Sequence, residues 1–315
     1  MGIIKENVSK DIQTQRVAKT VNESKIDQAF KLYDFAVDED EVKTQVKKIL
    51  DEHYAENDNL EVKKFLLSTV ELTSLHTTDT EESILAMVEK VNKMEQTYPD
   101  LPHVAAVCAY PVFTELIAQS LEVDGVEITN VCGNFPSSQS RMEVKVAETM
   151  LAVKDGATNV DIVLPVGKFL SEDYEGVADD INELKLACGN VPMKIILETC
   201  DLGSLANVKK AAILSMYAGA DYIKTSTGKE KAGATPEGVY VMCQAIKEYY
   251  DKTGIQIGLK PAGGINTVHD AVVLYTIVKE TLGKQWLTDY WYRMGTSRLT
   301  NLLLSEILGK ETKWF

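Results

Sequence analysis

The chain has 315 residues, 45% of them apolar, and its 33 basic residues stand against 47 acidic ones, for a net charge of −14. This composition supports a large folded core and disfavours binding to a nucleic-acid backbone. A small anionic ligand would need a local pocket of cations and backbone amides, which the amino end of a helix supplies.

The five cysteines are odd in number, widely spaced and without a CxxC pair, which indicates a reducing compartment. The first residues contain no long apolar segment, and no later stretch reaches the roughly 18 apolar residues that span a bilayer. We therefore expect a cytoplasmic protein without a membrane partner.

Residues 1–62 are mixed in charge, favour helix and include an amphipathic stretch at 42–53. This part is predicted to be a helical extension that packs on the rest of the chain or on a neighbouring subunit, and a homodimer is one candidate assembly. Residues 63–315 are predicted to form the main domain of the chain.

From residue 66 onward, short apolar runs rich in strand-forming residues alternate with longer segments of helical period. Eight such units predict a closed (β/α)8 TIM barrel. The alternative is an open flavodoxin-like or Rossmann sheet, which needs fewer units and often carries a GxGxxG turn that this sequence lacks. The expected strands are 66–72, 104–109, 127–131, 159–163, 194–197, 222–224, 257–260 and 292–294, and the expected helices include 81–95, 141–154, 205–217, 236–250 and 267–282.

Two lysines end apolar runs and precede small polar and glycine residues: Lys224 in YIKTSTGKE and Lys260 in IGLKPAGGI. Because lysine is rare inside strands and costly to bury unpaired, a purely structural role explains them poorly. The carboxyl ends of barrel strands line the active site. A lysine held there beside a second ammonium loses its proton more readily, and its amine can then attack a carbonyl to form a Schiff base.

Asp161, in NVDIVLP, alternates with Val160 and Ile162 and is expected to point into the barrel, where a carboxylate needs cationic partners. Asp161 and the two lysines are therefore predicted to meet. The alternative is a buried ion-pair network that only fixes barrel geometry.

Glycines follow three of the expected strands and expose amides at the start of a helix: Gly228, the pair Gly263 and Gly264, and Gly295 in the run that continues to Ser297. They predict a phosphate-binding site, since barrels often bind phosphate with the loops after strands seven and eight. The four histidines are scattered and predict no metal site. Cys108 either faces the pocket or is a core thiol.

The segments KTSTGK at 224–229 and LKPAGGI at 259–265 resemble those of the deoxyribose-phosphate aldolases, class I aldolases on a TIM barrel. The resemblance runs from about residue 65 to 308 and includes VELTSL, AAVCAYP, DGATNVDIVLP, GADYIKTSTG and MGTS. It implies reversible cleavage of 2-deoxy-D-ribose 5-phosphate to D-glyceraldehyde 3-phosphate and acetaldehyde, a role in deoxyribonucleotide catabolism, and no metal or organic cofactor. The alternatives are another Schiff-base phosphosugar aldolase and a noncatalytic phosphosugar-binding barrel.

The same resemblance implies that Lys224 forms the Schiff base, Lys260 tunes it, Asp161 shuttles protons and Thr227 supports the proton network. The substrate contacts that it implies are Glu71, Thr73, Cys108, Gly228, Lys229, Gly263, Gly264, Ile265, Gly295 and Ser297.

Three residues depart from the family pattern: Glu71 stands where relatives commonly have aspartate, Asn266 where they often have arginine, and Phe315 where some have a tyrosine that reaches the site. Arg298 is expected to supply the cation that Asn266 lacks. Since a phenyl ring relays no proton, either water replaces the tyrosine hydroxyl or this tail does not enter the site.

Overall fold

The computed structural model describes residues 24–315, which fall into two compact units divided between Asp34 and Phe35. In the first unit the described part contains helix α2 (Lys25–Phe30), whose amino end is capped by the Ser24 hydroxyl accepting from the Asp27 amide at 2.9 Å. Residues 1–23 of the predicted extension lie outside the described residues.

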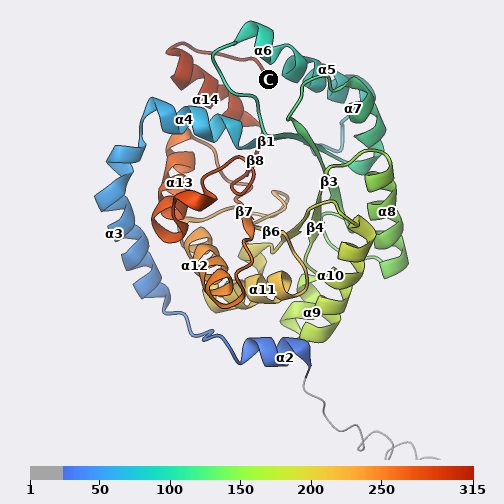
Figure 1. Cartoon of the computed structure of the whole chain (residues 1–315), viewed down its shortest axis with the longest axis vertical. Helices are drawn as coiled ribbons and strands as arrows, with labels where there is room; N and C mark the ends of the chain where they lie inside the picture. The colour runs from blue at the N-terminus through green and yellow to red at the C-terminus, as the bar shows by residue number, and fades with distance from the viewer. Residues whose placement is uncertain (1–23) are drawn as a thin grey trace, which may run out of the picture. The chain divides into compact units, whose positions relative to one another are not determined.

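The second unit is an eight-stranded parallel barrel surrounded by helices (Figure 1). The strands follow the order β7-β6-β5-β4-β3-β2-β1-β8, and parallel bridges from Leu259 to Tyr292 and from Ala262 to Gly295 join the two outer strands of that order. The predicted TIM barrel is thereby confirmed, and the open-sheet alternative is wrong. The strands are β1 (Val70–Thr73), β2 (Ala106–Ala109), β3 (Glu127–Cys132), β4 (Asn159–Val163), β5 (Met193–Ile196), β6 (Tyr222–Lys224), β7 (Gly258–Lys260) and β8 (Met294–Thr296).

Helices alternate with the strands and bury apolar faces against them. Their starts follow local rules: the Thr267 hydroxyl accepts from the Asp270 amide at 3.1 Å and Asp270 accepts from the Thr267 amide at 2.9 Å, a reciprocal cap. In the described residues of this unit the helices are α3 (Glu39–Asn57), α4 (Leu60–Ser68), α5 (Glu81–Asn92), α6 (Met94–Thr97), α7 (Thr114–Ser120), α8 (Met142–Lys154), α9 (Val166–Leu170), α10 (Tyr174–Cys188), α11 (Leu205–Tyr217), α12 (Pro236–Thr253), α13 (Val268–Leu282) and α14 (Arg298–Leu308). None of the helices in residues 24–315 is long and apolar enough to cross a bilayer.

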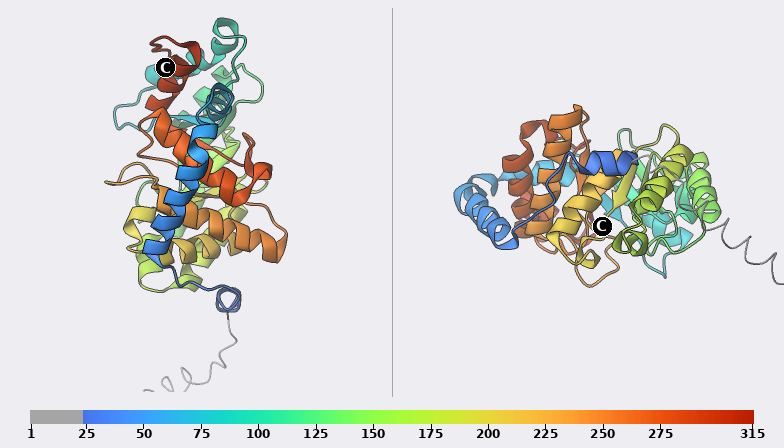
Figure 2. Two further views of the ribbon diagram at one scale, coloured as in Figure 1. Left: turned by 90° about the vertical axis from the view of Figure 1, so that its left-hand side faces the viewer. Right: turned by 90° about the horizontal axis from the view of Figure 1, so that it is seen from below.

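Helix α3 lies on the outer side of the helical ring, along α12 and α13 (Figures 1 and 2). Asn57 donates to the Thr276 hydroxyl at 3.2 Å, and the Lys279 ammonium reaches Asn57 at 2.7 Å and Glu56 at 2.9 Å. These contacts tie α3 to α13, and both belong to the compact unit 35–315. A functional boundary at residue 62 stays a prediction.

Several expected strands begin or end elsewhere in the structure, and the first is shifted most. Residues 66–68, predicted as strand, end helix α4, because an apolar run with Leu66 and Leu67 fully buried fits a buried helix end as well as a strand. The last strand begins two residues later than expected: Tyr292 makes only an isolated bridge, and pairing with β1 starts where Met294 lies opposite Val70.

Candidate active site

The middle of β4 and the carboxyl ends of β6 and β7 bring Asp161, Lys224 and Lys260 together inside the barrel. Lys224 and Lys260 are neighbours in register, and both ammonium groups donate to the same Asp161 oxygen, Oδ2, at 2.7 Å and 2.6 Å. Asp161 and Lys260 are fully buried, and Lys224 is 3% exposed. The predicted meeting of these side chains is therefore present in the structure.

Glu71, on β1, lies on the other side of this group. Its Oε2 accepts from Lys260, and its Oε1 lies 3.3 Å from the Lys194 ammonium and 3.8 Å from Arg293 Nη1. The departure from aspartate therefore gives a carboxylate long enough to contact three cations. Glu71 is fully buried and belongs to the layer beneath the pocket.

Lys194 and Arg293 also belong to this cluster, although neither was predicted as a site residue from the sequence. Lys194 is fully buried on β5, lies opposite Asp161 in register, and contacts Asp161 Oδ1 at 3.4 Å and Asn159 Oδ1 at 2.8 Å. Arg293, 4% exposed, pairs with Glu127 at 3.0 Å. The signal for Lys194 was available, since a lysine within an apolar strand was the same feature that singled out Lys224.

Burial is the largest influence on the pKa of Lys224 and lowers it; Asp161 partly opposes this effect, and the charge of Lys260 lowers the pKa further. For Lys260 burial acts in the same direction, but Asp161 and Glu71 outweigh it and raise the pKa. Lys224 is thus the more easily deprotonated lysine. The expected direction is confirmed, although desolvation contributes more to it than the neighbouring ammonium does.

The carboxylates respond in the opposite sense. Burial alone would raise the pKa of Asp161, but Lys224, Lys260 and Lys194 together lower it, and Lys194 with Lys260 does the same for Glu71. Both acids therefore stay ionised. With Lys224 neutral, the cations Lys194, Lys260 and Arg293 match the anions Glu71, Asp161 and the partly exposed Glu127, so this group of side chains is electrically balanced.

The loop after β6 is held by Glu198, which the sequence analysis also missed. Glu198 Oε2 accepts from the Thr227 amide at 3.1 Å and from the Thr227 hydroxyl, which in turn accepts from the Lys229 amide at 3.1 Å. Glu198 is 4% exposed and adopts φ 52° and ψ 62°, a left-handed conformation that is unusual outside glycine. A local sequence pattern does not reveal this position, because the hydrogen bonds that accompany the left-handed conformation come from Thr227, which follows a different strand.

A pocket of about 180 Å³ lies above Lys224, between the loops after β1, β6, β7 and β8. Eight predicted site residues line it: Thr73, Lys224, Thr227, Gly228, Lys229, Gly263, Gly295 and Ser297. The amides of Gly228, Gly264 and Ile265 have no acceptor among the described residues and could meet a phosphate. Gly295 differs, because its amide donates to the Pro261 carbonyl at 2.9 Å. This hydrogen bond helps to close the barrel, so the amide does not face a phosphate as a free donor.

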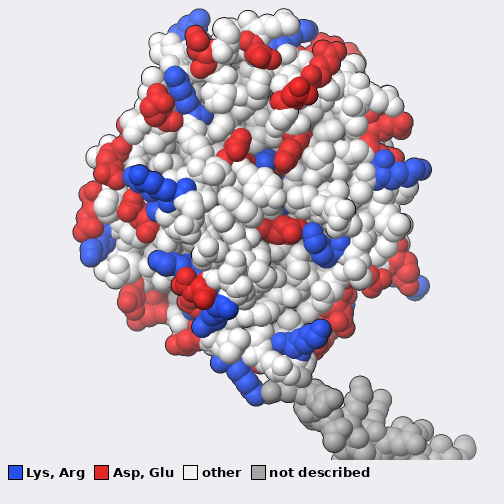
Figure 3. Space-filling model, in the orientation of Figure 1, with Lys and Arg blue, Asp and Glu red and all other residues white. Residues whose placement is uncertain are grey.

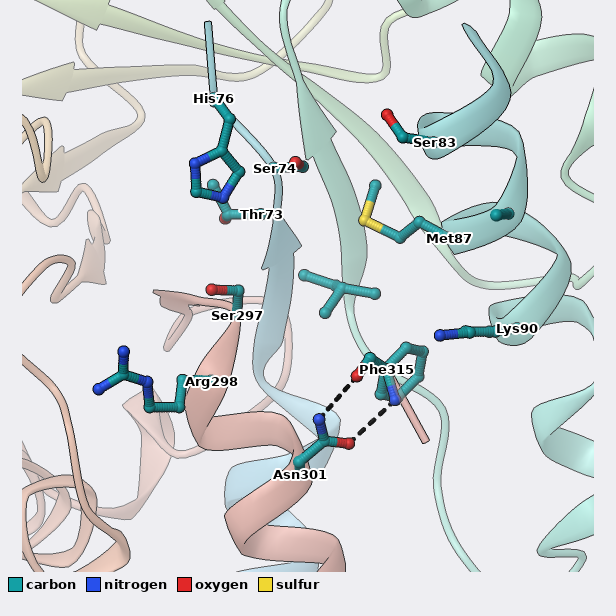
Figure 4. Close-up of a pocket in the computed structure, with 12 residues that line it drawn as sticks. Thr73, Ser74, His76, Ser83, Met87, Lys90, Ser297, Arg298, Asn301 and Phe315 are labelled. Carbon is teal, nitrogen blue, oxygen red and sulfur yellow. Dashed lines mark hydrogen bonds between the residues drawn. The ribbon is translucent and has the colours of Figure 1, made fainter. Parts of the chain in front are cut away.

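Arg298 and Phe315 line a neighbouring cavity of about 320 Å³, not the pocket above Lys224 (Figure 4). The Asn301 side chain holds the tail there, donating to the Phe315 carbonyl at 2.7 Å and accepting from its amide at 2.9 Å. Of the two possibilities for the tail, the structure supports the one in which it stays outside. Thr73, His76 and Ser297 line both spaces, so Arg298 adjoins the pocket without lining it.

Cys108 packs with Leu75 and Val131 and is fully buried, which supports the reading as a core thiol. Its sulfur and one oxygen each of Glu71 and Asp161 lie within 4.8 Å of one another, a spacing that could suit a metal. Lys260 donates to both of these carboxylates, so a metal ion would have to displace an ammonium from a balanced cluster. These donors are therefore better matched to the ammonium groups beside them than to a metal ion.

Comparison with known proteins places these residues in a family context. The DeoC/LacD family aldolases match residues 65–300. Deoxyribose-phosphate aldolases of Homo sapiens and Mus musculus are each 41% identical over 197 residues, which is 62% of this chain and 62% of theirs. A Caenorhabditis elegans protein provisionally assigned to the same activity is 41% identical over 241 residues, 76% of this chain and 79% of its own.

Among solved structures, a deoxyribose phosphate aldolase of Aeropyrum pernix, described as tetrameric, matches with a TM-score of 0.62 and 27% identity. The match covers 83% of this chain and 96% of that one. The barrel, the buried lysines and these similarities point to one class of chemistry.

Proposed function

Because the chain belongs to the DeoC/LacD family of aldolases, we propose that it reversibly cleaves 2-deoxy-D-ribose 5-phosphate to D-glyceraldehyde 3-phosphate and acetaldehyde. The observation that carries this proposal is the pair of lysines on one Asp161 oxygen, of which Lys224 alone borders the pocket. The names of the human and mouse relatives support the substrate.

The neutral amine of Lys224 attacks C1 of the open-chain aldehyde and forms a carbinolamine, which loses water to give an iminium ion. The fully buried Lys260 stays protonated and holds Asp161 ionised, so that its charge is available without competing for the aldehyde. The iminium carbon becomes the electron sink for the next step.

Asp161, through a water molecule, accepts the proton of the C3 hydroxyl. The C2–C3 bond breaks, its electron pair moves into the C1–C2 bond to form an enamine, and glyceraldehyde 3-phosphate leaves. Protonation of the enamine at C2 and hydrolysis of the resulting iminium release acetaldehyde and restore Lys224. Every step uses side chains and water, without a metal or organic cofactor.

The phosphate is proposed to meet the amides of Gly228, Gly264 and Ile265, with the Lys229 ammonium nearby. That ammonium donates to the Leu75 carbonyl at the pocket wall. Amides that converge from separate loops bind a dianion without a charged ring of side chains. Thr73 and Ser297, which also border the pocket, are proposed as hydroxyl contacts to the sugar.

We further propose that the protein acts in the cytoplasm and does not bind nucleic acid, with a homodimer as one candidate assembly. The net charge of −14 opposes nucleic-acid binding, and on the face drawn in Figure 3 basic side chains stand among acidic ones without forming one basic patch.

The decisive experiment treats the purified protein with acetaldehyde and borohydride. We expect a two-carbon adduct on Lys224 by mass spectrometry, and none in Lys224→Met. A coupled assay should show cleavage of deoxyribose 5-phosphate that Lys224→Met abolishes. A noncatalytic phosphosugar binder would give no adduct, and a different Schiff-base aldolase would give an adduct with a ketose phosphate but would not use acetaldehyde as donor.

A further inference from the structure

A second polar cavity, of about 400 Å³, lies beyond the carboxyl ends of β3 and β4. It is enclosed by the loops that follow these strands and by helices α8, α9 and α10, and its polar walls include Ser138, Arg141, Lys145, Lys168 and Asp180. It shares no lining residue with the pocket above Lys224. None of these side chains takes part in the proposed reaction.

Lys145 is the most informative wall residue, because it is 2% exposed and incompletely compensated. Its ammonium donates to the Ser138 hydroxyl at 2.8 Å, and its nearest carboxylate, Asp180, is 3.9 Å away. Asp180 is already paired with Lys168 at 2.8 Å. One carboxylate thus serves two ammonium groups, and burial lowers the pKa of Lys145.

Beside the same cavity, the start of α8 adds donors without a protein partner among the described residues. Arg141 has no acidic side chain within 4.0 Å among residues 24–315, and α8 begins without a side-chain cap. The amides of Met142 and Glu143 find no acceptor in the described part of the chain. The Ser140 hydroxyl, also in the wall, is inaccessible to solvent and has no hydrogen-bond partner in that part either.

Three cations against one carboxylate leave this cavity with a net charge of +2 in a protein whose net charge is −14. The buried ammonium of Lys145, the exposed guanidinium of Arg141 and the free amides of α8 border one space, and such a set of donors favours an anion with several acceptor oxygens. An ion-pair cluster that served stability alone would bring its acids and bases to parity and would leave fewer donors unused.

We infer that this cavity binds the phosphate group of a small molecule, at a site separate from the proposed catalytic pocket. A volume of about 400 Å³ exceeds one phosphate ion and leaves room for a small organic part, so a phosphate monoester fits. Lys145 and Arg141 contribute charge, and Ser138, Ser140 and the first amides of α8 contribute directional hydrogen bonds.

The test follows the amide signals of Met142 and Glu143 in two-dimensional NMR spectra while inorganic phosphate or glycerol 3-phosphate is added at constant ionic strength. We expect both signals to shift and to saturate. Arg141→Ala and Lys145→Met should each raise the dissociation constant about tenfold, since each removes a charged donor. Asp180→Asn should lower it, because it removes the competing carboxylate.

Lys154→Ala is the matched control, since it removes the same charge from the exposed far end of α8. It should leave the dissociation constant unchanged. Signals that do not move, shifts that do not saturate, or equal weakening in Lys154→Ala and Arg141→Ala would overturn the inference. If Lys145→Met fails to fold, the opposite effects of Arg141→Ala and Asp180→Asn still decide it. Cleavage of deoxyribose phosphate by Arg141→Ala should match the unmodified protein.

Discussion

Replacing Lys260 by methionine tests the electrostatic part of the proposed mechanism. Lys224 and Lys260 each lie within 2.7 Å of Asp161 Oδ2, so their nitrogens are at most about 5.4 Å apart, twice that distance. At an effective dielectric constant of about 20, two charges so placed repel each other by about 3 kcal/mol. Removing Lys260 also leaves Lys224 as the one ammonium that donates to Asp161 Oδ2 among the described residues. Both changes favour the protonated form of Lys224, and 3 kcal/mol corresponds to a roughly hundredfold lower neutral fraction at neutral pH.

A lysine whose pKa is lowered by folding is neutral above that pKa, so Schiff-base formation should increase as pH rises through it and should be slow below it. In Lys260→Met the whole rise should move to higher pH. The assay is borohydride trapping of the acetaldehyde adduct across a pH series. Lys194→Met is the control, since Lys194 contacts Glu71 and the other Asp161 oxygen, and it should move the profile much less. An unchanged profile in Lys260→Met would refute the reasoning.

Three further predictions address other parts of the structure. Glu198→Ala should lower kcat/KM at least about tenfold, because it removes two hydrogen bonds that a carboxylate makes to Thr227, while Glu198→Gln should retain part of the activity; equal values for the two variants would contradict this. Gly258→Ala should lower the melting temperature by about 5 °C or more, because the new Cβ would lie 2.0 Å from the Tyr222 ring; Gly167→Ala, whose Cβ would meet nothing closer than 3.6 Å, should melt as the unmodified protein does. Arg298→Ala should raise KM for deoxyribose 5-phosphate more than for deoxyribose, since Arg298 follows Ser297, which lines the pocket, and equal changes would exclude Arg298 from phosphate binding.

The alternation of apolar runs with helical segments was enough to predict the barrel, because each unit carries its own local signal. The same reasoning placed Lys224 and Lys260 together, since parallel strands end at one edge, and the alternation along β4 directed Asp161 toward them into the barrel. For these three residues, strand position alone predicts proximity.

Other parts of the site depend on contacts that no local pattern encodes. Glu71 meets Arg293 only because β8 closes against β1, and Glu198 reaches Thr227 only because its backbone takes a left-handed turn. The use of the Gly295 amide in barrel closure was hidden for the same reason: the glycine suggested an open turn, while its hydrogen bond depends on where β7 lies. Long-range register decides such features, and a single sequence leaves it open.

The junction of β7 with β8 differs from the other strand junctions, since it consists of isolated bridges with hydrogen bonds at Leu259, Arg293 and Gly295. Lys260 lies on this seam. Heat or denaturant should therefore open the barrel first between β7 and β8. Lys260 would then be exposed to water before the rest of the protein unfolds. Loss of turnover should accordingly precede global melting.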